Sequence, residues 1–190
     1  GDGFSDDTHI FQEAVEKYAN IYIPQGWYIV KEPLTLKQNT NLIGLHPGTT
    51  ILLTLGGNLA FSGFGAPQAQ LTTPQGGKNI VCGIFLNADA YNYRAVNCKW
   101  MAGEGSYMYD VKFSGHDKAR FFHNGQSAVN PLEKPMSITP ETHDLITRAW
   151  DNQHWSLWIT NGGGGSFRDI WTANEYSSAG LYISHTDTPG

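Results

Sequence analysis

The chain has 190 residues and a net charge of −5, from 12 lysines and arginines against 17 aspartates and glutamates. This acidic balance argues against a nucleic-acid-binding protein, which needs a basic surface, and no segment approaches the roughly 20 apolar residues of a membrane-spanning helix. A charged fraction of 15%, with 22 glycines and 6 tryptophans, favours an extracellular β-protein with a sugar-handling surface. We therefore expect a secreted, periplasmic or cell-surface protein with no nucleic-acid or membrane partner.

One amphipathic helix is predicted near the start of the chain. Its apolar face follows the i, i+1, i+4, i+5, i+8 spacing, and it consists of Ile10, Phe11, Ala14, Val15 and Tyr18. A short polar side chain at Asp6, Asp7 or Thr8 can cap this helix, because its oxygen accepts from the free N–H groups of the first turn. We expect the helix to end at Asn20.

The segments after this helix are short and rich in β-branched and aromatic residues. Turn residues separate them, and no second helical pattern lies between them, which excludes βαβ units. Two loop excursions interrupt the series, at about 56–77 and 115–152. Short segments of this kind are typical of a β-solenoid, whose coils stack on one another and whose open end needs a cover. The sequence therefore predicts one all-β domain over 1–190, a β-solenoid with an N-terminal capping α-helix.

The cysteines and the acidic start of the chain indicate no metal site. Cys82 and Cys98 do not form a C-x-x-C pair, so we interpret them as small buried side chains, with a single disulfide as the alternative. An acidic group near the predicted helix consists of Asp2, Asp6, Asp7 and His9. Helix capping and turn formation explain its spacing without a bound ion. We predict neither a metal nor a cofactor.

The opening of the chain has a family resemblance. The stretch GDGFSDDT at 1–8, followed by IFQEA at 10–14 and IYIPQGWY at 21–28, resembles the start of right-handed β-helices of the pectate-lyase superfamily. Lyases, hydrolases and phage tailspikes share this opening, so the resemblance implies a fold more than a chemistry. It implies that the predicted solenoid is a right-handed parallel β-helix.

Later segments are similar to the narrower glycoside hydrolase family 55-like group. They are LIGLHP at 42–47, WMAGEGS at 100–106, DVKF at 110–113 and WITNGGGGSFRDIW at 158–171. That group is similar to exo-acting β-1,3-glucanases built from two β-helices side by side. The resemblance implies hydrolysis of a β-glucan-like polysaccharide by carboxyl general acid/base catalysis. It also implies that the catalytic acid lies in a later half, so we expect a C-terminal remainder of the same protein as a partner.

Acidic residues in the strand-rich regions are the candidates for catalysis, because glycoside hydrolysis usually needs two carboxyls. These acids are Glu104, Asp110, Asp151, Asp169 and Glu175. Asp110 and Asp169 lie inside alternating segments and Glu104 lies in a tight bend, so we interpret all three as structural. Glu175 follows Trp171 in a loop that can face a groove, and it is the catalytic candidate.

Aromatic residues gather in the same part of the chain. Flat aromatic faces pack on the C–H faces of sugar rings, while polar side chains bind the hydroxyls. The predicted substrate-binding residues are Trp155, Tyr176, Trp171, Asn174 and Arg168. Trp150, Trp158, Asn161 and Asp151 lie in the same region. Trp158 and Trp171 can instead fill the coil interior, because both lie in alternating segments.

Two other functions stay open. A polysaccharide lyase acting on uronate polymers needs a Lys or Arg base and often Ca²⁺, and the chain shows no cluster of basic residues. A non-catalytic glycan-binding or structural β-helix, such as a tailspike-like adhesin, needs no catalytic carboxyl. A polysaccharide is the expected partner of the enzymes and of the binding module. Turnover of the polysaccharide distinguishes the enzymes from the binding module.

Overall fold

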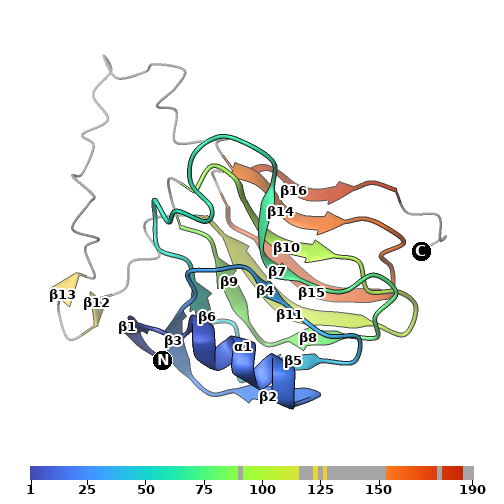
Figure 1. Cartoon of the computed structure of the whole chain (residues 1–190), viewed down its shortest axis with the longest axis horizontal. Helices are drawn as coiled ribbons and strands as arrows, with labels where there is room; N and C mark the ends of the chain where they lie inside the picture. Colours follow the sequence, from blue (N-terminus) through green and yellow to red (C-terminus); the bar gives the residue numbers. More distant parts are fainter. Residues whose placement is uncertain (90–91, 116–121, 124–125, 128–152, 175–176, 186–190) are drawn as a thin grey trace.

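The computed structural model describes residues 1–89, 92–115, 122–123, 126–127, 153–174 and 177–185. This part of the chain is built from short strands and one short helix (Figure 1). In chain order the elements are β1 (Asp2–Asp6), α1 (Thr8–Lys17), β2 (Asn20–Ile23), β3 (Gly26–Ile29), β4 (Leu34–Thr35), β5 (Asn41–Gly44), β6 (Thr50–Leu53), β7 (Gln68–Thr72), β8 (Ile80–Cys82), β9 (Phe85–Asn87), β10 (Ala95–Trp100), β11 (Tyr107–Ser114), β12 (Phe122–His123), β13 (Gln126–Ser127), β14 (Gln153–Ile159), β15 (Ser166–Thr172) and β16 (Ser177–Ile183). The pair β12–β13 is antiparallel, and the remaining strands pair in parallel.

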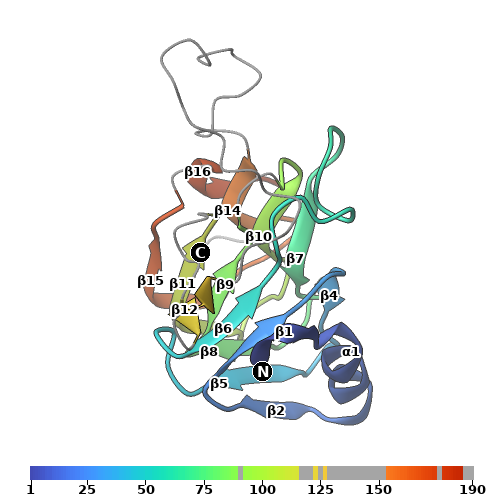
Figure 2. The same ribbon diagram turned by 90° about the vertical axis from the view of Figure 1, so that its left-hand side faces the viewer.

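The parallel strands stack in three ladders (Figures 1 and 2). The first ladder is β2–β5–β8 and then the N-terminal halves of β11 and β15. The second is β1–β3–β6–β9 and then the C-terminal halves of β11 and β15. The third is β4–β7–β10–β14–β16. Because the chain visits the ladders in turn, successive coils lie one strand spacing apart, about 4.8 Å. The predicted all-β, parallel, β-helix-like fold is confirmed.

A repeated backbone bend forms the corner between the first and second ladders. It falls at Gly83, Asp110 and Asp169, which occupy the same position in successive coils. Their φ angles are +66°, +50° and +52°, in the left-handed region that glycine adopts freely and aspartate more readily than most residues. The bend lets one continuous strand serve two ladders, so β11 pairs with both β8 and β9.

Side chains from all three ladders fill the interior. Leu42, Met108, Leu157 and Trp100 belong to one continuous buried cluster. Trp100 is fully buried, and its indole Nε1 donates to the carbonyl oxygen of Gly164 in the next coil (2.9 Å). The burial of this apolar surface is the main stabilising contribution to the fold.

Buried amide side chains join neighbouring coils where the second ladder leads into the third. The Asn97 side-chain amide donates to the carbonyl oxygens of Leu86 (3.1 Å) and Ser114 (2.9 Å). The Asn174 amide donates to the Gln153 side-chain oxygen (3.0 Å). These bonds satisfy polar groups that burial would otherwise leave without partners.

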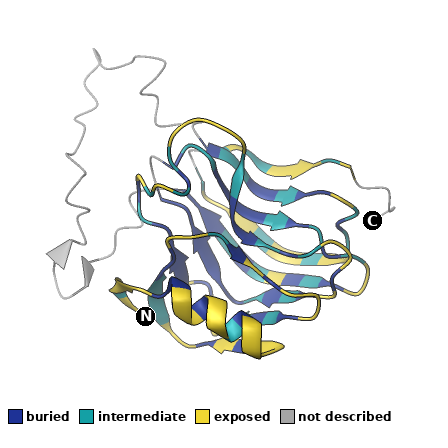
Figure 3. Ribbon diagram, viewed as in Figure 1, coloured by how far each residue is buried: buried dark blue, intermediate teal, exposed yellow. Residues whose placement is uncertain are grey.

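Helix α1 covers the N-terminal end of the interior, as predicted (Figure 3). Phe11 and Val15 are buried, and the Phe11 ring meets Tyr28 edge-on with centroids 5.5 Å apart. The predicted apolar face is wrong at its margin, because Ile10 and Tyr18 are 63% and 62% exposed. A helix lying across the end of a solenoid contacts it through a narrow stripe, so residues beside that stripe stay in solvent.

At the start of α1 the predicted capping bond is made by Asp6, whereas the end of the helix differs from the prediction. Asp7 occupies the N-cap position without a side-chain cap, and its Oδ2 accepts from the backbone N–H of Ile29 instead (3.1 Å). Asp6 Oδ1 accepts from the backbone N–H (3.1 Å) and the hydroxyl (2.6 Å) of Thr8. The helix ends at Lys17, and Asn20, where we expected it to end, is instead the first residue of β2. Among the described residues, no helix has the length and apolar character needed to span a membrane.

The two predicted loop excursions have different outcomes. The segment 56–77 contains strand β7, which pairs with β4 and β10, so it is not a loop throughout. Its Gly, Pro and Gln content concealed this strand. Most of the segment 115–152 lies outside the described residues.

Both cysteines are free thiols, so the alternative of a single disulfide is wrong. Cys98 is fully buried in the core cluster, as predicted, and burial raises the pKa of its thiol. Cys82 is only half-buried, and burial, followed by the nearby Asp110 charge, raises the pKa of its thiol.

Candidate functional site

The predicted site residues lie on different parts of the fold. Four residues of the predicted region fall outside the described residues: Trp150, Asp151, Glu175 and Tyr176. Trp155 lies on the third ladder, Arg168 on the first and Trp171 on the second. Asn174 is half-buried, and its side chain takes part in the amide bonds between coils. The structure does not gather the predicted set, but it brings Trp155 together with two other aromatic residues.

Trp155, Trp158 and Tyr182 form an aromatic platform on the outer surface of the third ladder. Trp155 stacks on Tyr182 with ring centroids 4.0 Å apart and 21° between the planes, and it meets Trp158 edge-on at 5.0 Å. Trp158 and Tyr182 are register partners. The Trp158 indole Nε1 donates to the Ser184 hydroxyl (3.0 Å). The expectation that Trp158 fills the coil interior is therefore wrong.

A shift in the alternation of β14 places both tryptophans on the outer surface. Ser156 and Leu157 are consecutive and both buried. The Ser156 hydroxyl lies 2.9 Å from that of Thr172, and Leu157 packs in the core. A regular strand alternates sides at every residue, so two consecutive inward side chains leave Trp155 and Trp158 outward on either side of them.

Basic side chains flank the platform. Lys99 is the register partner of Trp158, and its Nζ lies 4.5 Å from the centroid of the Trp158 ring, a cation–π contact. The His154 ring lies 5.4 Å from Trp155. Burial, together with the positive charge of Arg94, lowers the pKa of His154. His154 is therefore mainly neutral at pH 7, and Lys99 and Arg94 supply the positive charge.

The loop between β6 and β7 borders this surface. Phe61 is buried against Ala95 and anchors the loop on the outside of the coils. Further along, Phe64 is 91% exposed and stacks on Tyr93 with centroids 6.2 Å apart and 10° between the planes. The Arg94 Nε donates to a carbonyl oxygen of the same loop (3.0 Å). Aromatic rings and cations therefore extend beyond the platform along β10 and this loop.

A lysine lies between two aromatic rings on the outer surface of the second ladder. Trp27, Ile51, Phe85, Lys112 and Trp171 occupy successive register positions from β3 to β15. The Lys112 Nζ lies 4.4 Å from the ring centroid of Phe85 and 4.4 Å from that of Trp171. Burial lowers the pKa of Lys112. Trp171 is 48% exposed, so it does not fill the interior either.

Two aspartates occupy equivalent positions at the same corner of successive coils. Asp110 and Asp169 are opposite each other in β11 and β15, because the residues on either side of them are register partners. Their Cα atoms are therefore one strand spacing apart, about 4.8 Å. The Asp169 Oδ2 lies 3.3 Å from the Arg168 Nε. Retaining glycosidases hold their two carboxyls about 5–5.5 Å apart, and neighbouring corner positions allow such a separation.

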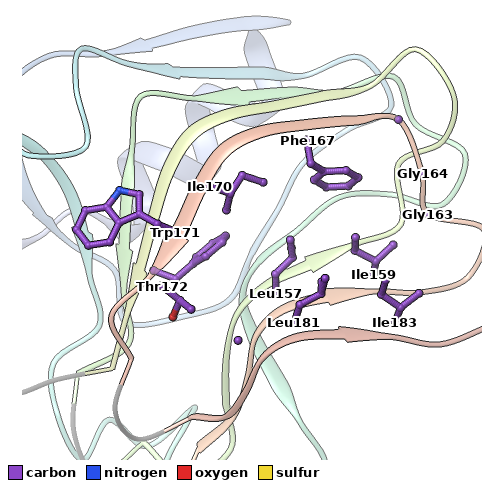
Figure 4. Close-up of a pocket in the computed structure, with 13 residues that line it drawn as sticks. Leu157, Ile159, Gly163, Gly164, Phe167, Ile170, Trp171, Thr172, Leu181 and Ile183 are labelled. Atoms are coloured by element: carbon purple, nitrogen blue, oxygen red, sulfur yellow. The ribbon is translucent and has the colours of Figure 1, made fainter. Parts of the chain in front are cut away.

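A cavity of about 670 Å³ opens at the end of the interior between β14, β15 and β16 (Figure 4). Leu157, Ile159, Phe167 and Leu181 are among the side chains that face it. The lining contains no charged side chain. The cavity offers an apolar packing surface and no group for acid/base chemistry.

Among the described residues, no three His, Cys, Asp or Glu side chains gather as a metal-binding group. Asp2, the acid of the opening GDG, accepts hydrogen bonds from the backbone N–H groups of Ser5 (2.8 Å) and Phe4 (2.9 Å). These bonds hold the pKa of Asp2 well below its ordinary value of 3.8. The carboxylate of this motif stabilises a turn.

Lys99, Lys112 and Tyr182 were not among the residues predicted from the sequence. Each is the register partner of a tryptophan in a neighbouring coil. Alignment of the segments 153–159 and 177–183 as successive coils would have placed Tyr182 beside Trp158. The missing signal was therefore the register between coils.

A parallel, β-helix-like stack with aromatic rings and cations on its outer surfaces places this protein in the class of β-solenoids. The chain matches the family described as Rhamnogalacturonase A/epimerase, pectate lyase-like over residues 1–188, and it belongs to this family. No curated protein matches the chain. The predicted relation to pectate-lyase-like β-helices is confirmed, while the narrower likeness to glycoside hydrolase family 55 stays a prediction.

Proposed function

We propose that this chain binds a polysaccharide along the outer surface of the third ladder, as a sugar-contacting unit of a carbohydrate-active enzyme. The main support is the stack of Trp155 on Tyr182 beside Trp158. Flat rings in contact pack on the C–H faces of sugars, and hydroxyl groups need polar partners nearby. Lys99 and Ser184 contact the Trp158 ring and supply such partners. The family description, which names a rhamnogalacturonase, supports a polysaccharide as the ligand.

The finer features of this proposal rest on the sequence and on general rules. A β-glucan-like polysaccharide is the substrate implied by the resemblance of the later segments, and a secreted or cell-surface location suits such a polymer. We also infer that the three ladders wind as a closed right-handed helix. Connections between parallel strands of one sheet are right-handed in about 98% of cases, which supports this winding.

Affinity electrophoresis in gels that contain laminarin tests the binding site. Trp155→Ala removes the ring that contacts both other members of the platform, so we expect binding to weaken about tenfold or more. Tyr22→Ala is the matched control, because it removes an aromatic ring that is 60% exposed on the first ladder. If laminarin slows the migration of the Trp155→Ala variant as much as that of the original chain, the proposal is contradicted.

Hydrolysis is the second candidate function, and the opposed Asp110 and Asp169 support it. The test is the release of reducing sugar from laminarin by the full chain, compared with Asp110→Asn and Asp169→Asn. Asparagine tolerates the left-handed backbone of these positions, so the variants remove charge and keep the bend. Loss of activity in both variants supports this pair, and loss only in Glu175→Gln supports the acid predicted from the sequence. A product that absorbs in the near ultraviolet favours a lyase, and no product favours a binding module.

A further inference from the structure

We propose that residues 62–67, in the loop between β6 and β7, form a lid that closes over a ligand held on the aromatic platform and brings the Phe64 ring onto it. The lid rests on the proposed function, because the platform supplies the ligand that the lid covers. It contains no residue of the platform itself. Binding at Trp155 and closure of the lid are therefore separate events that separate measurements can follow.

The lid is fixed at both ends by one residue. The backbone N–H of Arg94 donates to the carbonyl oxygen of Phe61 (2.8 Å), and the Arg94 carbonyl oxygen accepts from the backbone N–H of Gln68 (2.7 Å). Phe61 is fully buried, and Gln68 is the first residue of β7. The backbone before and after the lid therefore stays in place while residues 62–67 change conformation.

Glycines on both sides of Phe64 give the lid its freedom. Gly63 and Gly65 have φ angles of +75° and +145°, which residues with a Cβ atom rarely adopt. A Cβ atom added at Gly63 would meet no other atom within 4 Å, so the space around this backbone is open. Hinges are a few loop residues that absorb such backbone rotations.

The Phe64 ring is the exposed tip of the lid. It is 91% exposed, and its aromatic contact among the described residues is the nearly parallel Tyr93 ring, 6.2 Å away. Aromatic pairs lie about 4.5–7 Å apart, so this stack is a loose one. Because an apolar ring in water gains free energy from any apolar surface that covers it, Phe64 favours a second position in which a ligand covers it.

Two side chains beside the platform hold the lid in its present position. The Arg94 Nε donates to the carbonyl oxygen of Ala66 (3.0 Å), and the His154 ring hydrogen-bonds to the backbone of Gly65. The Arg94 bond is exposed, so water can replace it when the lid moves. The His154 ring also lies 5.4 Å from the Trp155 ring. The tip of the lid is therefore one histidine ring away from the platform, within reach of a ligand bound there.

Closure acts mainly on the release of the ligand. A sugar that lies on Trp155 has its inner side covered by the platform, and the closed lid covers its outer side. Such a ligand leaves only after the lid has opened, so the lid lowers the dissociation rate more than it changes the association rate.

Dissociation of the full chain from immobilised laminarin, followed by surface plasmon resonance, tests the lid. We expect Phe64→Ala to dissociate about tenfold faster than the original chain, and Phe64→Tyr, which keeps a flat ring, to restore slow dissociation. Leu59→Ala is the matched control, because Leu59 is 92% exposed in the same loop but lies outside residues 62–67. A dissociation rate that Phe64→Ala leaves unchanged overturns the lid.

A second measurement uses the unmodified chain. Chymotrypsin cleaves after aromatic residues in exposed loops, so it should cut the free chain after Phe64, and saturating laminarin should slow this cut about tenfold or more. Equal rates with and without laminarin overturn the lid. If the original chain does not bind laminarin, the proposed function fails and the lid fails with it. Binding that Trp155→Ala abolishes, with dissociation that Phe64→Ala leaves unchanged, is the failure of the lid alone.

Discussion

Phe11→Ala tests how helix α1 attaches to the rest of the chain. The Phe11 side chain is 5% exposed in the core cluster and meets Tyr28 edge-on at 5.5 Å. Truncation of a buried phenylalanine costs about 3–5 kcal/mol, of which the ring pair accounts for about 0.5–1.5 kcal/mol. Domains are typically stable by about 5–15 kcal/mol. We therefore expect this variant to lose a large part of the free energy of unfolding.

Ile10→Ala is the matched variant, one residue away on the same helix. Its side chain is 63% exposed, so we expect a change of at most about 0.5 kcal/mol. Alanine is the best helix former, so neither substitution destabilises the helix itself. The difference between the unfolding free energies of the two variants therefore measures the effect of burial. Urea unfolding followed by circular dichroism gives both free energies. Equal costs for the two variants would refute the position of α1 over the end of the interior.

Three further predictions concern buried and titratable groups. Asn97→Leu should cost about 1–3 kcal/mol, as measured by urea unfolding, because it removes two buried hydrogen bonds, to the carbonyl oxygens of Leu86 and Ser114, worth about 0.5–1.5 kcal/mol each. The pKa of Asp6 is lowered, chiefly by the Thr8 hydroxyl, so its carboxylate stabilises the fold above the ordinary value of 3.8 and the effect fades as the pH falls through the lower folded pKa. Asp6→Ala should therefore lower the urea midpoint at pH 7, with a difference that vanishes in acid. Cys98 should resist a thiol reagent at about pH 8 until the chain unfolds, and fast labelling of the native protein would contradict its burial.

The fold was predictable where a local rule determines it. Phe11 and Val15 recur at helical spacing, and the short segments after them could only be covered by stacking. Strand β7 was missed because its Gln68–Thr72 segment lies among Gly, Pro and Gln residues, and pairing with β4 and β10 makes it a strand. The bend at Asp110 was also hidden, because the alternating segment around it looks like one straight strand.

The site was predictable only one residue at a time. Trp155 was correctly expected outside the core, but its partner Tyr182 lies in the next coil, and only the register brings the two together. Trp158 was weighed as an interior residue because a regular strand alternates, and the consecutive burial of Ser156 and Leu157 breaks that alternation. A rule applied to one strand at a time predicts neither the contact between neighbouring coils nor the break in the alternation of β14.

The stacking itself explains why rings and cations meet on these surfaces. Equivalent positions in successive coils lie about 4.8 Å apart, close to the separations of 4.4 and 4.5 Å at which Lys112 and Lys99 lie from the rings of Trp171 and Trp158. A substitution at one outward position therefore changes the neighbours of two coils and leaves the interior unchanged. The ladders fix the spacing of such contacts, and the outward residue types decide which rings and cations meet.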